Sequence, residues 1–259
     1  MIIYRFDGSF EGLLTCVFEA FEMKQFQVQV VMEDYFQPNV FDESIFIYTE
    51  VNKAKRVLTG IEKITSKKFC IELKTAYLSE LPQVYQWIFK CIIEIFKTKT
   101  DQSTNFGNPL ILNIAKIVKS VNRERHRMKA FIRFKKTNNS LFYAIIAPDF
   151  NVLPLILNHF KNRYADQHWV IYDEKRKYGF YFDTQQLYPV TFLDLVAQQS
   201  TSLQNFKNDE RESLFDELWK DYFESINIKE RKNTKLHLQY VPKRYWKYLN
   251  EKHPHKKNN

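Results

Sequence analysis

Glycine is scarce in this chain, at five of 259 residues. The five are Gly8, Gly12, Gly60, Gly107 and Gly179. No two of them form G-x-G, so they can build neither a P-loop nor a dinucleotide fingerprint, both of which bring closely spaced glycines against phosphates. The spacing therefore argues against a P-loop NTPase and against a Rossmann enzyme.

Cysteine is rare and unclustered. The three cysteines, Cys16, Cys70 and Cys91, form no C-x-x-C pair and no zinc-knuckle spacing, and they cannot hold an iron–sulfur cluster. We therefore expect no cofactor and no metal. The chain does not open with a signal peptide, so we expect a cytoplasmic protein. The longest apolar run, residues 84–96, is interrupted by polar and charged side chains and is no membrane span.

Charge, by contrast, is plentiful and unevenly distributed, with a net charge of +9. Residues 116–136 carry nine Lys/Arg against Glu124 alone, and residues 229–257 carry ten against two acids. Two segments are acidic: residues 1–50 have nine acids against two bases, and residues 209–224 have seven acids against two bases. Basic patches attract phosphate backbones, although acidic and basic elements could also neutralise each other across the fold.

Hydrophobic periodicity predicts a helix-rich α+β protein with small antiparallel hairpins at about residues 128–147 and 169–183. Other strands are predicted at residues 2–6 and 45–49, and Asp7 or Ser9 is expected to cap the helix that follows the first. Helices are predicted over residues 10–23, 51–64, 69–78, 83–97, 109–127, 152–164 and 210–225, with a short one over 242–249. We expect one domain over residues 1–250, with sub-lobes 1–100 and 109–250, and a disordered basic tail over 251–259.

The helix predicted over residues 109–127 carries a basic ridge. At 100° per residue, its apolar residues share one arc, and an arc about 80° wide on the opposite side holds Lys116, Lys119, Arg123 and Arg127. Such a ridge suits the tracking of DNA phosphates, because an arginine can fork onto a phosphate. A solvated face without a ligand explains the pattern equally well.

Arg125 points to the apolar side of the same helix. A buried guanidinium needs an acid partner, because an isolated buried charge is too costly. Asp7, Glu11 and Asp149 are the candidate partners.

The segment after this helix alternates as a strand would over residues 129–135. On that interpretation Phe131, Arg133 and Lys135 share one face, where aromatic and basic residues could stack single-stranded bases and hold their backbone. A phenylalanine at the rim of the core is the simpler alternative.

Five motifs together resemble a known family over nearly the whole chain. They are Tyr4-x-x-Asp7-Gly8-Ser9-Phe10-Glu11-Gly12-Leu13-Leu14, Arg123-Glu124-x-His126-Arg127-Met128-x-x-Phe131, Pro148-Asp149, His159-Phe160-x-x-Arg163 and Pro242-x-x-Tyr245-Trp246-Lys247. The chain resembles the DUF4130 family, whose members are assigned to DNA metabolism or repair and are found beside a radical SAM protein of DNA repair. In other members this region is fused in front of a family 4-like uracil-DNA glycosylase.

The resemblance implies an accessory DNA-repair protein whose partner radical SAM protein supplies the redox chemistry. The chain ends soon after Tyr245-Trp246-Lys247, so no glycosylase domain is expected, and it lacks the three-cysteine site of a radical SAM enzyme. Tyr245 and Trp246 could stack on a base, but anchoring the C-terminal helix is the favoured interpretation.

The candidate catalytic residues are His126, Asp149 and His159, with His168 as a further possibility. None of them makes a recognised spacing such as H-E-x-x-H, and a lone histidine is more often structural. The basic segment 116–136 offers only Glu124 to a metal, where a nuclease needs several carboxylates. The balance therefore favours a protein that is not an enzyme.

The leading hypothesis is a cytoplasmic DNA-binding accessory protein. Its phosphate contacts are expected at Lys116, Lys119, Arg123, Arg127, Arg133, Lys243 and Lys247. The acidic helix near residues 210–224 is a candidate docking surface for a basic partner protein. Two alternatives stay open: a nucleic-acid-processing enzyme that uses His126, Asp149 and His159, and a pure protein–protein adaptor.

Overall fold

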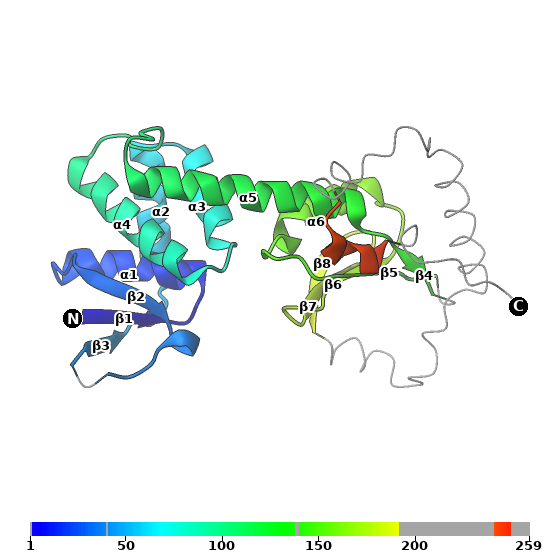
Figure 1. The fold of residues 1–259 in the computed structure, drawn as a ribbon, viewed down its shortest axis with the longest axis horizontal. Coiled ribbons are helices and arrows are strands. Elements are labelled where there is room, and N and C mark those ends of the chain that lie inside the picture. The colour runs from blue at the N-terminus through cyan, green and yellow to red at the C-terminus, as the bar shows by residue number, and fades with distance from the viewer. Residues whose placement is uncertain (1, 40, 138–139, 192–240, 250–259) are drawn as a thin grey trace, which may run out of the picture. The chain divides into compact units, whose positions relative to one another are not determined.

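The computed structural model describes residues 2–39, 41–137, 140–191 and 241–249 (Figure 1). The acidic helix predicted at 210–225 and the tail predicted at 251–259 lie outside these residues. The described chain is mixed α+β, as predicted, and it divides into two compact units, Met1–Arg123 and Glu124–Asn259. We call them the N-terminal and the C-terminal unit. Within the described ranges, no helix is long and apolar enough to cross a bilayer.

The N-terminal unit contains a parallel sheet with the strand order β2-β1-β3. The strands are β1 (Ile2–Phe6), β2 (Val28–Met32) and β3 (Glu43–Phe46), and the 3-10 turn η1 (Glu33–Tyr35) follows β2. The helices are α1 (Phe10–Glu22), α2 (Val51–Ile64), α3 (Lys67–Tyr77) and α4 (Pro82–Thr98). Their apolar faces and the strands form one core, in which Phe6, Leu13 and Ile88 are fully buried. Strand β2 was not predicted, and β3 begins two residues before the strand expected at 45–49.

The turn from β1 into α1 is built around Asp7, as its sequence suggests. One carboxylate oxygen of Asp7 accepts hydrogen bonds from the Ser9 backbone N–H (2.9 Å) and the Ser9 hydroxyl (2.7 Å). The other oxygen accepts a bond of 2.8 Å from the Thr49 hydroxyl, just beyond β3. Ser9 is the N-cap of α1 and accepts from the Gly12 N–H at 2.8 Å. Gly8 provides the positive φ of 79° that the turn requires.

Replacing Thr49 with valine is expected to raise the pKa of Asp7. Burial acts to raise this pKa, but the hydrogen bonds from Ser9 and Thr49 outweigh it and hold the pKa below its ordinary value of 3.8. A lowered folded-state pKa stabilises the protein above pH 3.8, and this contribution is lost as the pH falls through the folded pKa. The variant should therefore be less stable than the wild type near neutral pH, and the difference should shrink under acid. Urea unfolding across pH 2–6, or NMR titration of Asp7, checks this, and a difference that is constant with pH would contradict it.

Helix α5 (Pro109–Phe131) begins in the N-terminal unit and ends in the C-terminal unit. It runs four residues beyond the predicted end at 127, so the strand predicted over 129–135 is reduced to Lys135–Lys136. The helical stripe of Val121 and Met128 continues to Ile132, whose N–H donates to the Met128 carbonyl at 3.1 Å. The guanidinium of Arg133 then donates to the Ala130 carbonyl at 2.7 Å, at the C-terminal end of the helix.

The C-terminal unit contains a mixed sheet with the strand order β4-β5-β6-β7-β8. The strands are β4 (Lys135–Lys136), β5 (Phe142–Ile146), β6 (Trp169–Asp173), β7 (Tyr178–Phe182) and β8 (Leu187–Thr191). Both predicted hairpins exist, although β4 is short and β8 was not predicted. Strands β5 and β6 are parallel and are connected through α6 (Leu153–Arg163). The 3-10 segment η3 (Lys243–Tyr248) replaces the short helix expected at 242–249.

Aromatic packing holds α6 against one face of this sheet. The ring of Phe160 on α6 lies 6.4 Å from that of Trp169 on β6, between ring centroids. Phe134 contacts both rings at 5.6 and 6.1 Å. Phe134 therefore belongs to the core of the unit.

Candidate nucleic-acid interface

The amphipathic pattern predicted for α5 is confirmed. Its buried side carries Ile111, Ile114, Val121 and Met128. On the opposite side Lys116, Lys119 and Arg123 are exposed, whereas Arg127 is half-buried. We call the three exposed residues the α5 ridge. Binding of phosphate by these side chains stays a prediction.

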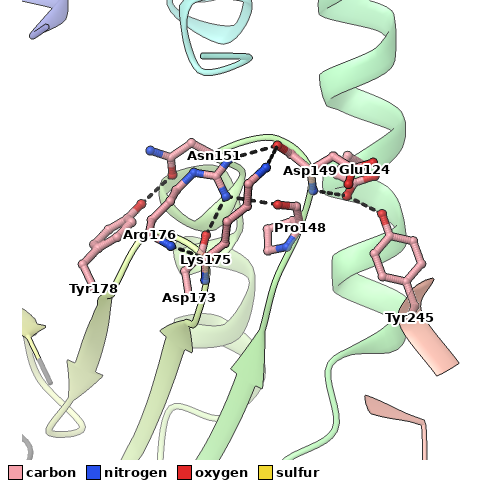
Figure 2. A network of polar contacts seen from close by, with 9 residues as sticks. All are labelled: Glu124, Pro148, Asp149, Asn151, Asp173, Lys175, Arg176, Tyr178 and Tyr245. Atoms are coloured by element: carbon pink, nitrogen blue, oxygen red, sulfur yellow. Dashed lines mark hydrogen bonds and ion pairs between the residues drawn. The ribbon is translucent and has the colours of Figure 1, made fainter. Parts of the chain in front are cut away.

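Glu124 is the only acidic residue in α5, and its side chain is 2% exposed. Its carboxylate accepts hydrogen bonds from the Tyr245 hydroxyl, from the Asp149 backbone N–H at 2.9 Å and from the Arg244 guanidinium at 3.2 Å. All these partners belong to the C-terminal unit (Figure 2 shows the first two). The only negative charge of α5 is therefore bonded to Tyr245, Asp149 and Arg244, and no residue of the ridge is among these partners.

The buried charge on α5 was expected to be Arg125, and this expectation is wrong. Arg125 is half-buried, and Glu124 next to it is the buried residue. Asp149, a predicted partner of Arg125, forms an ion pair of 2.8 Å with Arg244. Asp7, a second candidate, is bonded in the β1–α1 turn. The partners of the buried charge lie up to 121 residues away in the sequence, so a helical wheel could not reveal them.

The C-terminal segment η3 is anchored by Tyr245, as the favoured interpretation of that residue predicted. Tyr245 is 1% exposed, and its ring lies 5.6 Å from that of Phe131 at the end of α5. Phe131 therefore packs against a protein ring, and no strand face of Phe131, Arg133 and Lys135 exists. Lys243 is exposed, and Lys247 forms an exposed ion pair of 3.1 Å with Glu174. The hydrogen bonds from Lys247 and Tyr248 lower the pKa of Glu174.

A second polar network lies where the parallel strands β5 and β6 end (Figure 2). Asp173, at the end of β6, is fully buried and accepts a bond of 2.9 Å from the Arg176 guanidinium. Arg176 also donates to the carbonyls of Pro148 (3.1 Å) and Asp149 (3.0 Å), in the loop that follows β5. The network therefore holds the β5–α6 loop against the β6–β7 turn.

The predicted catalytic residues lie on three different segments: His126 on α5, Asp149 in the β5–α6 loop and His159 on α6. His126 is exposed on α5, and the Asp149 carboxylate is paired with Arg244. His159 is half-buried on α6, where burial and nearby cations lower its pKa. No hydrogen bond or ion pair joins these three residues in the described part of the chain. His168 lies elsewhere, 3.0 Å from the Tyr181 hydroxyl.

No cluster of three or more His, Cys, Asp or Glu side chains that could hold a metal occurs among the described residues. The three cysteines are buried and unpaired by disulfides. Burial raises the pKa of each thiol. None of them is suited to nucleophilic chemistry at neutral pH, because the thiolate is the reactive form.

The polar contacts unite three of the motifs noted in the sequence. Glu124 comes from the first basic motif, Asp149 from the Pro-Asp motif and Tyr245 from the closing motif, and the three meet around one carboxylate (Figure 2). Sequence reasoning noted each motif but did not connect them. It missed Arg244, Asp173 and Arg176 altogether, and nothing in their local spacing identifies them.

Comparison with protein families identifies the family of this chain. The model of the DUF4130 family, described as a domain of unknown function, matches residues 82–251, about two thirds of the chain. The matched region contains α4, α5 and the described part of the C-terminal unit, and the opening motif at Tyr4–Leu14 lies outside it. The comparison with curated proteins gave no significant match.

Proposed function

Because the chain belongs to the DUF4130 family, a domain of unknown function, we propose its function from the geometry of α5: a nucleic-acid-binding accessory protein of DNA metabolism or repair. The α5 ridge contacts backbone phosphates. Arg127, Arg133, Lys243 and Lys247 are the further cations assigned to this role from the sequence.

One observation carries the proposal. Helix α5 has six Lys or Arg residues and a single acid, and that acid is buried and bonded to Tyr245 and Arg244. A charged helix face that serves only as a solvent-exposed surface commonly carries both acidic and basic side chains, because neighbouring opposite charges stabilise the helix. The α5 ridge has no such neutralisation from its own helix. An uncompensated row of cations attracts phosphate backbones and releases their counterions.

The ridge is tested by a triple variant, Lys116→Gln/Lys119→Gln/Arg123→Gln. Each lost phosphate contact should reduce the slope of log K against log salt by about 1, so the triple variant should lose about 3. Its affinity for duplex DNA at low salt should fall by about tenfold or more. Fluorescence anisotropy across a salt series measures both quantities.

The matched control is Lys55→Gln/Lys63→Gln/Lys67→Gln, which removes the same charge from exposed positions on α2 and α3. If the control weakens binding as much as the ridge variant, binding depends on net charge and the ridge assignment is wrong. If the wild-type protein binds no DNA at low salt, the proposed function itself fails, and the protein–protein adaptor is the better account.

The partner radical SAM protein belongs to the same proposal and rests on the family resemblance. The acidic segment 209–224, outside the described residues, is its proposed docking segment by charge. Reversing the charge of Asp216, Glu217 and Asp221 should abolish co-purification of that partner without changing DNA affinity. Unchanged co-purification would contradict this part of the proposal.

A further inference from the structure

We propose that one face of the five-stranded sheet in the C-terminal unit is a platform on which the bases of a single nucleic-acid strand stack. This inference rests on the proposed function and adds a preference for single strands, carried by residues other than those of the α5 ridge. It replaces the stacking face expected at 131–135, which the structure does not form.

Strand register places one row of side chains across all five strands (strands labelled in Figure 1). The Cα partners across the row are Lys135, Tyr143, Val170, Tyr181 and Tyr188. Because side chains alternate between the faces of a strand and paired residues share a face, all of them lie on the same side of the sheet. Tyr172 of β6, two residues from Val170, lies on this side as well. We call these residues the tyrosine row and its face the tyrosine face.

The tyrosine face is open to solvent at Tyr188 and Ile145 and closed at Val170 and Val190, which are both 4% exposed. On the opposite face Trp169, Ile171 and Phe182 are at most 1% exposed, since α6 packs there. On the tyrosine face Tyr188 is 43% exposed and Ile145 is 44% exposed. Tyr143 and Tyr181 are half-buried, while the small side chain of Val170 is buried. Tyr188 is therefore the tyrosine of the row that is most open to a ligand.

Two rings of the row, Tyr181 and Tyr188, lie side by side with nearly parallel planes. The Tyr181 and Tyr188 centroids are 6.4 Å apart with 27° between the ring planes. The exposed ring of His168 lies on the other side of Tyr181, 6.2 Å from it between centroids and at an angle of 15°. Neighbouring aromatic rings on a sheet face, ending in a basic residue such as Lys135, are the combination by which sheet proteins bind single strands.

The phenols of Tyr181 and Tyr188 are uncharged at neutral pH, because the pKa of each lies above its ordinary value of 10.0. Burial raises the pKa of Tyr181, and the hydrogen bond to Asp183 raises that of Tyr188. The same bond to Asp183 fixes the orientation of the Tyr188 ring. A ring held in advance loses less entropy on stacking.

The test compares binding of single-stranded oligomers with binding of duplex DNA. Tyr188→Leu keeps an apolar side chain but removes the aromatic face, so affinity for oligo-dT and oligo-U should fall by about tenfold. Duplex affinity and the salt slope should not change, because neither depends on stacking. Tyr188→Phe keeps the ring and loses only the bond to Asp183, so it should lose much less affinity than Tyr188→Leu. Tyr48→Leu, at an exposed tyrosine of the N-terminal unit, is the matched control and should have no effect.

The outcomes separate this inference from the proposed function. If Tyr188→Leu binds single strands as the wild type does while the ridge variant loses affinity, the tyrosine face does not bind bases. A protein would then be the better candidate ligand for this face. If the wild type binds no nucleic acid of any kind, both proposals fail. If Tyr188→Leu weakens single-strand and duplex binding equally, the effect is not stacking, and the inference is overturned.

Discussion

Replacing Arg176 with methionine is expected to lower the free energy of unfolding of the C-terminal unit by about 3–5 kcal/mol. The Arg176 side chain is 9% exposed and neutralises Asp173, which is fully buried at the end of β6. Methionine keeps most of the apolar volume but leaves the carboxylate with only the backbone N–H groups of residues 175 and 176. The loop carbonyls of Pro148 and Asp149 lose donors at the same time. An uncompensated buried charge is among the largest costs that a single substitution can impose.

Lys175→Met is the matched control for this prediction. Lys175 precedes Arg176 in the same turn and donates to the same Asp149 carbonyl at 3.1 Å, but its side chain is exposed. Its loss should cost about 0.5 kcal/mol or less. Hydrogen exchange of the β6 amides under increasing urea reports on this unit alone, with the α1 amides as an internal reference. Equal effects of the two variants would show that Arg176 does not neutralise a buried charge.

Local patterns predicted the helices well because helices are stabilised by residues close in the sequence. The predicted bounds of α2 are those observed, and Pro82 occupies the first turn of α4 as its fixed φ favours. The end of α5 was missed because Lys129 to Phe131 fit a strand and a helix equally well. Only the burial of Met128 and Ile132 on the helical stripe decides between them.

Strand pairing was harder to predict because it depends on distant residues. Strand β2 pairs with β1, and its other edge is closed by Gln86 of α4. The Gln86 amide accepts from the Val30 N–H at 2.8 Å and donates to the Val28 carbonyl at 3.0 Å, from more than 50 residues away. The parallel pairing of β5 with β6 likewise depends on the crossover through α6, which a hairpin pattern does not reveal.

Some parts of the candidate site could likewise be predicted from the sequence, and others could not. The α5 ridge could be predicted from the sequence, because three of the four cations that the helical period assigns to one side of α5 are exposed. The role of Glu124 could not, because its partner Tyr245 follows 121 residues later. The tyrosine row could not be predicted either, since it depends on the register of five strands.

Replacing Tyr245 with alanine is expected to lower the free energy of unfolding of the C-terminal unit by about 3–5 kcal/mol. The change removes a ring that is 1% exposed and packs on Phe131. It also removes the hydroxyl that donates to the buried carboxylate of Glu124. Tyr245→Phe isolates the second contribution and should cost about 1.5–3 kcal/mol, as for hydrogen bonds to charged groups. Tyr248→Phe is the control, because its hydroxyl donates to the exposed Glu174 at 3.1 Å and should cost about 0.5 kcal/mol or less.

The pH dependence of Tyr245→Phe identifies the interaction. Burial and the hydrogen bond to Glu124 raise the pKa of Tyr245 well above its ordinary value of 10.0. A raised folded-state pKa gives stability that is fully present below pH 10.0 and is lost as the pH rises from there through the folded pKa, because the unfolded state loses its proton first. The difference between wild type and Tyr245→Phe should therefore be constant near neutral pH and shrink above pH 10.0. In Glu124→Gln the carboxylate is absent, so Tyr245→Phe should cost less in that background than in the wild type. Equal costs in both backgrounds would show that Tyr245 anchors η3 by packing alone.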